Sequence, residues 1–139
     1  MKIFTDENIP PHLAIGFNIL QAPESKKTGI PIEVIHWPEY STYSEKDEEW
    51  MPKVAALKSC MITQDYQIAK RKHEIEIFRK CGLGIFFIKG KNKKLQLTIW
   101  EMVEVLAKVW PELTNIAVNE KKPFGYEILY NGKIRKVTL

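Results

Sequence analysis

Residues 60–66, CMITQDY, form a short apolar run that ends abruptly on the carboxylate of Asp65. The N-terminus carries a similar stretch, MKIFTDEN at residues 1–8, in which the apolar run ends on Asp6. Parallel strands of an open α/β sheet present their carboxyl ends to one crevice, where ligands bind. If the two strands are neighbours, the two acids meet at one edge of the sheet.

Outside these stretches, predicted strands alternate with predicted helices. Short apolar runs bounded by Pro, Gly or polar residues predict strands at residues 2–5, 32–37, 60–66 and 83–88. Apolar residues repeated every three or four positions predict helices at 11–20, from Asp47 as N-cap, at 68–80 and at 95–109, the last ended by Pro111. The polar segments expected to form loops are 21–30 and 39–46.

Such alternation predicts an α/β fold in which right-handed crossovers join parallel strands. We expect a three-layer sandwich with a mainly parallel central sheet, plus a C-terminal β-hairpin over residues 124–137. The pair Asn131-Gly132 suits the turn of that hairpin. We expect one domain over residues 1–139, with a core of about 1–113 and a C-terminal extension of about 114–139 that holds the hairpin.

The composition is that of an ordinary globular chain, with 139 residues, 45% hydrophobic and 27% charged. Cys60 and Cys81 stand in apolar surroundings without the spacing of a metal site, so we expect two reduced thiols and no zinc. No apolar run approaches the roughly 20 residues that span a bilayer. We therefore expect a soluble, cytoplasmic protein that does not associate with membranes.

The net charge of +4 conceals an asymmetry between the two halves of the chain. Residues 1–66 carry a net charge of −4 and residues 67–139 a net charge of +8. This distribution fits ordinary solvated surface, and it equally fits a metal-binding acid cluster flanked by a phosphate-binding surface.

Three acids occupy positions where they could carry chemistry. Asp6 and Asp65 end the first and third strands, and Asp47 opens the helix before the third strand. A lone Asp at a strand end more often caps a turn or a helix. Two such acids on neighbouring strands instead favour a site for Mg²⁺ or Mn²⁺, which need only two or three carboxylates and keep several waters.

The segments IFTDENIPP at residues 3–11, DEEW at 47–50 and ITQD at 62–65 resemble the signature of PIN-like domains. The resemblance is to the bacterial branch related to ribonuclease toxins of type II toxin-antitoxin modules. It continues more weakly through residues 84–87, 100–101, 110–111 and 123–125, and so spans most of the chain. It implies a PIN fold in which acids hold Mg²⁺ or Mn²⁺ and a metal-activated water cleaves RNA.

Matched motif by motif, the resemblance makes Asp6 and Asp65 metal ligands and Asp47 the helix acid of the site. Thr63 would orient a ligand or a water through its hydroxyl. Related sequences often read Asp-x-Asp after the third strand, whereas this chain has the amide of Gln67 two residues after Asp65. Two further acids, Glu7 and Glu48, would compensate for the missing charge or would serve only as first-turn helix acids.

The cations expected to bind RNA follow the third and fourth strands. Lys70, Arg71 and Lys72 come soon after Asp65, and Lys91 follows the fourth strand together with Lys89. Lysine and arginine neutralise phosphates and make binding depend on salt. Lys93 and Lys94 are interpreted as solvated surface, and His36 as a structural residue at the end of the second strand. Neither His36 nor His73 has a Cys or acid partner at metal-ligand spacing.

Three hypotheses of function follow. The leading one is a metal-dependent endoribonuclease, a toxin held in check by an antitoxin protein and able to form a homodimer. The alternative, motivated by Gln67, is a catalytically weakened PIN-like domain that binds RNA or a protein. A phosphoacceptor receiver domain is disfavoured, because it needs another strand and helix between Asp65 and Lys89.

Overall fold

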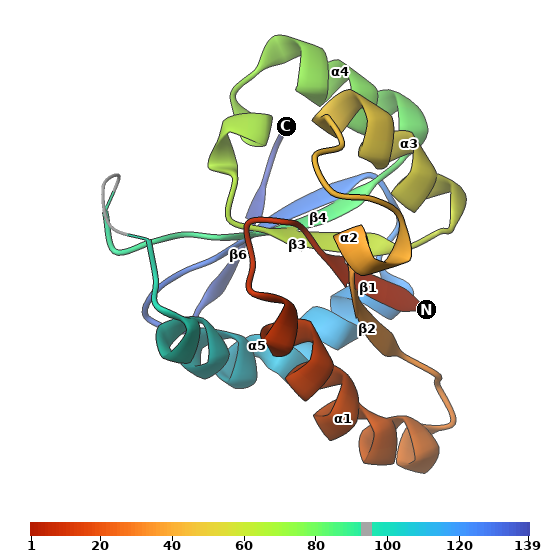
Figure 1. Ribbon diagram of the computed structural model, residues 1–139, viewed down its shortest axis with the longest axis vertical. Coiled ribbons are helices and arrows are strands. Elements are labelled where there is room, and N and C mark those ends of the chain that lie inside the picture. Colours follow the sequence, from red (N-terminus) through yellow and green to blue (C-terminus); the bar gives the residue numbers. More distant parts are fainter. Residues whose placement is uncertain (93–95) are drawn as a thin grey trace.

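The computed structural model describes residues 1–92 and 96–139, and it contains one six-stranded sheet between two layers of helices (Figure 1). The strands follow the order β2-β1-β3-β4-β5-β6 across the sheet. Their bounds are β1 Lys2–Thr5, β2 Glu33–His36, β3 Cys60–Thr63, β4 Gly84–Ile88, β5 Phe124–Ile128 and β6 Ile134–Val137. The expectations for Lys93, Lys94 and a helix start at Leu95 lie outside the described residues.

The first five strands are parallel and β6 alone runs antiparallel to its neighbour β5. The mainly parallel sandwich and the C-terminal hairpin predicted from the sequence are therefore confirmed. The hairpin is continuous with the central sheet, because β5 pairs along its whole length with β4. Gly132 adopts a left-handed φ of 82° in its turn, where glycine has no steric penalty.

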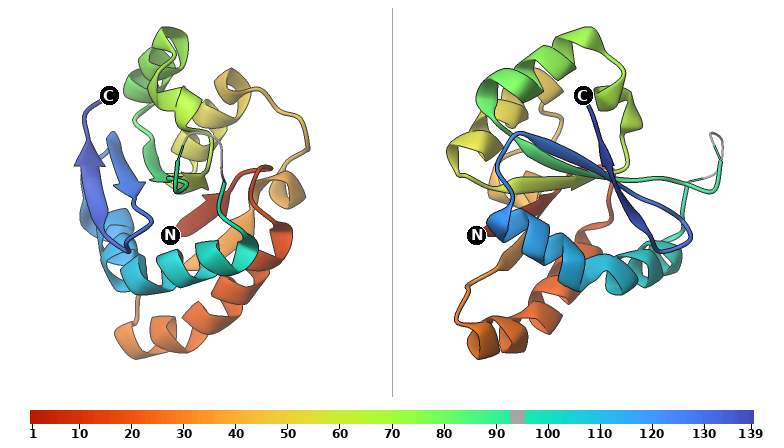
Figure 2. Two further views of the ribbon diagram at one scale, coloured as in Figure 1. Left: turned by 90° about the vertical axis from the view of Figure 1, so that its left-hand side faces the viewer. Right: turned by 180° about the vertical axis from the view of Figure 1, so that it is seen from behind.

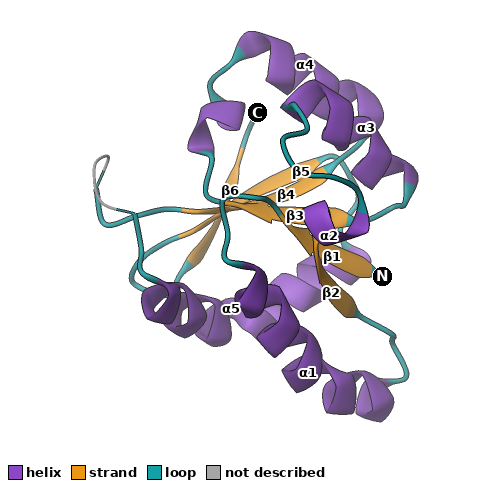
Figure 3. Cartoon of the chain, in the orientation of Figure 1, coloured by secondary structure: helices purple, strands orange, loops and turns teal. Residues whose placement is uncertain are grey.

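The helices are α1 Pro11–Thr28, α2 Trp37–Tyr40, α3 Asp47–Ala56, α4 Lys72–Cys81 and α5 Ile99–Asn119, with a 3₁₀ helix η1 at Tyr66–Ala69. Figure 3 shows the strands as a layer between them, and the two further views in Figure 2 show α1 and α5 on one face, α3 and α4 on the other. Among the described helices, none is long and apolar enough to cross a membrane.

Alternate residues of the buried strands supply the two halves of the core, because successive side chains of a strand point to opposite faces. Ile62 and Phe86 pack on the α1 and α5 side, whereas Met61 and Phe87 pack on the α3 and α4 side. Helices cover both faces of the sheet, which explains why strands β3 and β4 are continuous apolar runs.

Helix α1 is longer than predicted, since the expected loop at 21–30 is helical as far as Thr28. The prediction was wrong because the Pro, Ser, Lys and Gly residues of this polar segment are typical of a loop, whereas tertiary contacts hold it in the last turns of the helix. The Gln21 side chain accepts a hydrogen bond from Trp110 Nε1 at 2.8 Å, and the Ser25 hydroxyl accepts one from the Ile32 amide at 3.2 Å. Gly29 then ends the helix with a left-handed φ of 73°.

Helix α5 also continues past its predicted end at Pro111 to Asn119. Its apolar stripe extends beyond the proline, and Leu113 and Ala117 are buried against the sheet. It crosses the residue 113 boundary that the sequence suggested. Burial of this face outweighs the backbone hydrogen bond that the proline cannot make.

Smaller differences affect the segments that carry the candidate site. The expected loop at 39–46 begins within the short helix α2. Asp47 is the first helical residue of α3 and Lys46 its N-cap, one residue earlier than predicted. The helix predicted at 68–80 is divided into η1 and α4, because the chain turns at Lys70 and Arg71 before α4 begins.

Gly84 is expected to be required by close packing between β4 and β5. A Cβ atom built there would lie 2.5 Å from Cζ of Phe124, a ring held in the core. Gly84→Ala is expected to lower the free energy of unfolding by about 1–3 kcal/mol through overpacking, measured by urea denaturation. Gly16→Ala, with nothing within 4 Å of the new Cβ, is the control and should stabilise helix α1 by up to about 1 kcal/mol.

Candidate active site

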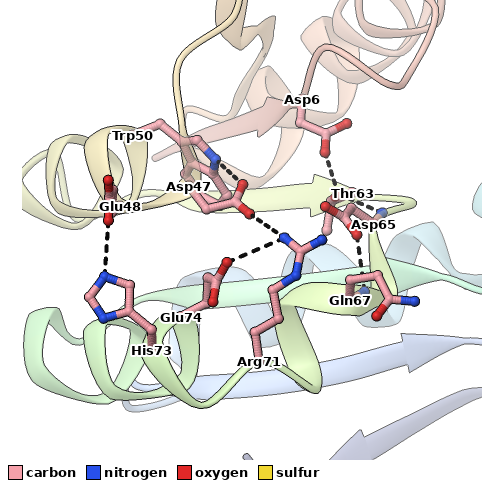
Figure 4. A network of polar contacts seen from close by, with 10 residues as sticks. All are labelled: Asp6, Asp47, Glu48, Trp50, Thr63, Asp65, Gln67, Arg71, His73 and Glu74. Carbon is pink, nitrogen blue, oxygen red and sulfur yellow. Dashed lines mark hydrogen bonds and ion pairs between the residues drawn. The ribbon is translucent and has the colours of Figure 1, made fainter.

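The two acids that end the first and third strands meet at the carboxyl edge of the sheet. Strands β1 and β3 are neighbours, and the Asp6 amide donates a hydrogen bond to the Ile62 carbonyl at 3.2 Å. The Thr63 hydroxyl donates to the Asp6 carboxylate and accepts from the Asp65 amide at 2.9 Å (Figure 4). One buried hydroxyl thus contacts both acidic residues. The sequence predicted that Asp6 and Asp65 would lie close together, and the structure places them so.

Asp6 is the most perturbed acid of the site. Its residue surface is 8% exposed, and burial raises the pKa of its carboxyl to about 7. Hydrogen bonds from Thr63 and from the Asn8 amide act in the opposite direction, while the negative charges of Asp65 and Asp47 raise the pKa further. A cation in this pocket would therefore relieve a carboxylate that is both desolvated and repelled by its neighbours.

Asp47 approaches the pocket from α3, in the layer above the sheet. Trp50 Nε1 donates a hydrogen bond to its Oδ1 atom at 2.8 Å. Burial is the largest effect on the Asp47 carboxyl and raises its pKa, and the negative charges of Asp65 and Glu74 raise it further. The hydrogen bond from Trp50 and the positive charge of Arg71 lower the pKa. The effect of Asp65 on this pKa indicates that the helix acid and the strand acid share one electrostatic environment.

Arg71 lies on the opposite wall of the pocket, at the N-cap of α4. Its Nη1 atom is 3.7 Å from Asp47 Oδ2 and 3.3 Å from Glu74 Oε1. In Figure 4 the guanidinium points toward Asp47 and the strand acids. Of the cations predicted to bind RNA, this one lies beside the acids.

Two of the auxiliary residues, Glu7 and Glu48, line the same pocket as the acids but have hydrogen-bond or ion-pair partners outside the Asp6 and Asp65 pair. Glu7 accepts a hydrogen bond from the Ser44 amide at 2.9 Å, and Glu48 lies 2.9 Å from His73 Nε2. Gln67 contributes its backbone amide, which donates to Asp65 Oδ1 at 3.0 Å, and its residue surface is exposed. Asp65 thus caps η1 as well as facing the pocket.

The other predicted RNA-binding cations are dispersed. Lys70 Nζ lies 5.7 Å from the centre of the Tyr66 ring, and Lys72 is the exposed first residue of α4. Lys91 pairs with Glu101 at 2.6 Å and lies 4.9 Å from the centre of the Tyr130 ring. The structure therefore brings Arg71 to the acids and leaves these three lysines away from the pocket lining.

The acids line a pocket of about 410 Å³ beneath α3 and beside α4. Seven of the lining residues are acidic and two are Lys or Arg, so the pocket favours cations. Within residues 1–92 and 96–139, no three Asp, Glu, His or Cys side chains are arranged to ligate one ion together. The donor set nevertheless fits Mg²⁺ or Mn²⁺, which bind through one or two carboxylates and complete their shell with water.

A parallel sheet with acids gathered at its carboxyl edge defines an α/β protein with a candidate cation site. A family model described as a PIN like domain matches residues 1–90, which include all three acids. The chain belongs to this family, whose fold is of the nuclease type. Neither the curated proteins nor the solved structures include a match to the chain.

Sequence reasoning missed several residues that shape the site. Gln64 Nε2 donates to the Asn8 carbonyl at 2.9 Å and joins the two strand-end loops. Glu74 pairs with Arg71, a spacing of three residues that was visible in the sequence once a helix was assigned there. Trp50 packs in the core and donates its indole hydrogen bond to Asp47.

Proposed function

We propose that this protein is a metal-dependent endoribonuclease that cleaves RNA with a metal-activated water. The observation that carries the proposal is the pair of acids, Asp6 and Asp65, joined by the Thr63 hydroxyl at the carboxyl edge of a PIN-like sheet. Catalytic acids are characteristically buried and shifted in pKa, as Asp6 is.

The proposed cofactor is Mg²⁺ or Mn²⁺. Asp6 and Asp65 would hold the ion, and Asp47 would join directly or through a water. When bound, the ion would supply a water of lowered pKa and would neutralise charge on the scissile phosphate. The hydrogen bonds of Thr63 to Asp6 and of Trp50 to Asp47 would keep these carboxylates oriented.

The proposed role of Arg71 is to bind a phosphate of the RNA at the mouth of the pocket. Its guanidinium already lies beside the acids, and arginine can bind phosphate through two parallel hydrogen bonds. Lys70, Lys72 and Lys91 would add longer-range attraction for the RNA backbone.

We further propose that the protein is the toxin of a toxin-antitoxin module, with an antitoxin protein as its partner and a homodimer as its assembly. This part of the proposal rests on the resemblance of residues 3–11, 47–50 and 62–65 to the ribonuclease toxins. An antitoxin would be expected to supply a cationic side chain or a covering segment to the acidic pocket, because the pocket lining is rich in carboxylates.

A second candidate is an RNA- or protein-binding module with weakened catalysis. The observation that favours it is Gln67, an uncharged amide where related sequences carry an acid, with Glu7 and Glu48 bonded to other partners. This candidate predicts binding of RNA without turnover.

The proposal is tested by titrating Mn²⁺ into the protein by calorimetry and by following cleavage of total RNA. Wild-type protein is expected to bind Mn²⁺ and cleave RNA, and Asp65→Asn to reduce cleavage about a hundredfold or more while the unfolding midpoint stays similar. Glu104→Gln, an exposed acid on α5, is the matched control and should change neither measurement. Binding of RNA without cleavage would support the second candidate. A protein that neither binds Mn²⁺ nor cleaves RNA would contradict the enzyme hypothesis.

A further inference from the structure

A buried carboxylate outside the acidic pocket links the C-terminal hairpin to the candidate site. Glu127, on β5, has a side chain that is 2% exposed, and β5 lies beyond the residues that the family model matches. Its Oε2 atom accepts a hydrogen bond from Arg135 Nε at 3.1 Å, its Oε1 atom accepts one from the Tyr66 hydroxyl, and Oε1 is 3.5 Å from Lys89 Nζ. Tyr66 directly follows Asp65, so Glu127 connects the hairpin to a proposed metal ligand.

The sheet register places this network in one row with the site. Thr63 is opposite Phe87, Phe87 is opposite Glu127, and Glu127 is opposite Arg135. Neighbouring strands are about 4.8 Å apart, so the row runs roughly 14 Å from Thr63 to Arg135. The Tyr66 ring lies across the row, in edge contact with Phe87 at 5.3 Å between ring centres.

Cations outnumber acids around Tyr66. Lys89 Nζ is 4.8 Å and Lys70 Nζ is 5.7 Å from the centre of its ring, and Arg135 bonds the same carboxylate that the tyrosine hydroxyl contacts. We call Lys70, Lys89 and Arg135 the Tyr66 cation cluster. One carboxylate, Glu127, pairs with Lys89 and Arg135, whereas Lys70 lies over the Tyr66 ring; the Arg135 and Lys89 side chains remain 60% and 38% exposed. The cluster therefore presents excess positive charge to solvent beside an acidic pocket.

We propose that the Tyr66 cation cluster binds the backbone of the RNA strand that flanks the cleaved phosphate. The inference rests on the proposed function and extends it, because it names a binding surface that the C-terminal hairpin supplies. The pocket itself repels phosphate through its carboxylates, so a polyanionic substrate needs cations nearby to be held. Glu127 holds Arg135 in the row that leads away from Thr63 and holds Lys89 beside the Tyr66 ring, which directs the strand toward the sheet edge at β6.

The test measures binding of a fluorescently labelled 12-nucleotide RNA by anisotropy, in the Asp65→Asn background so that cleavage does not intervene. Lys89→Gln and Arg135→Gln together are expected to weaken binding about tenfold at moderate salt. Loss of two phosphate contacts should also reduce the slope of log K against log salt by about 1.4. Arg135→Lys, which keeps the charge, should restore most of the affinity lost on Arg135→Gln.

The matched control removes two lysines from the C-terminal turn of α1, in the opposite layer. Lys26→Gln with Lys27→Gln makes the same change in net charge and should leave affinity and slope almost unaltered. Equal losses in the two double variants would overturn the proposal by showing that net charge alone matters. Unchanged RNA binding in the Lys89→Gln and Arg135→Gln double variant would also overturn the proposal. So would a loss of binding to a labelled polyglutamate peptide as large as the loss of binding to RNA, because the cluster would then attract any polyanion.

The two proposals fail in different experiments. A wild-type protein that binds RNA through the Tyr66 cation cluster but cuts no RNA would overturn the proposed enzyme and leave this surface in place. A protein that cuts RNA with the same efficiency after both substitutions would overturn the surface and leave the enzyme. Urea unfolding of each variant verifies that a loss of binding is not a loss of fold.

Discussion

Replacing Asp6 with asparagine is expected to abolish RNA cleavage and to change how stability depends on pH. The carboxylate is the buried member of the acid pair, and its loss removes a proposed ligand of the metal. Cleavage should fall about a hundredfold or more, since even residues that only support a metal ligand often contribute ten- to a hundredfold. Mn²⁺ affinity measured by calorimetry should fall in parallel.

The pH effect of this substitution follows from the raised pKa of the Asp6 carboxyl. In the unfolded chain the carboxyl has its ordinary pKa of 3.8, whereas in the folded protein burial raises the pKa to about 7. The folded state therefore binds the proton more tightly, and the stability contributed by the protonated group is lost as pH rises between about 4 and 7. The shift corresponds to about 4 kcal/mol at higher pH. Asp6→Asn does not lose stability in this way, because asparagine does not ionise.

The measurement is urea denaturation of wild type and Asp6→Asn at pH 4.5 and pH 8, in the presence of a chelator. The free energy of unfolding of the variant minus that of wild type should be more positive at pH 8 than at pH 4.5. Comparing the two proteins cancels the other acids, several of which have lowered pKa values and act in the opposite direction. A difference between the proteins that is the same at both pH values would contradict a buried, shifted carboxyl at position 6.

The sequence predicted the sheet better than the helices. The central strands β3 and β4 are continuous apolar runs, and the runs that end at Asp6 and Asp65 predicted both their strands and the edge of the sheet where the candidate site lies. Helix ends were less predictable because prolines at 23 and 111 would end an isolated helix. In the folded chain, contacts with distant residues such as that between Gln21 and Trp110 determine where these helices end.

The candidate site was predictable to the extent that it depends on adjacent strands. Asp6, Thr63 and Asp65 come together because β1 and β3 pair directly, which sequence reasoning could anticipate. The position of Arg71 depended on a turn between η1 and α4 that the continuous amphipathic pattern concealed. Glu127 was not found, because its partners are 8, 38 and 61 residues away and no local spacing connects them.

Trp50→Ala is expected to be the most destabilising substitution near the site. The indole is 4% exposed within the core on the α3 and α4 side, and removing a buried tryptophan costs about 3–5 kcal/mol. Folded domains are stable by only about 5–15 kcal/mol, so the variant should be close to unfolded in mild urea. Trp100→Ala is the matched control; Trp100 is 77% exposed, and its loss should change the free energy of unfolding by less than about 0.5 kcal/mol.

Trp50→Phe separates the packing of this side chain from its hydrogen bond. Phenylalanine keeps most of the buried ring but cannot donate to Asp47, so the expected cost is about 1–3 kcal/mol, below that of alanine. Because the lost bond lowers the pKa of the Asp47 carboxyl, the pKa should rise and Mn²⁺ should bind more weakly at pH 6 than to wild type. Equal Mn²⁺ affinity in Trp50→Phe and wild type would show that Asp47 takes no part in holding the ion, leaving Asp6 and Asp65 as its protein ligands.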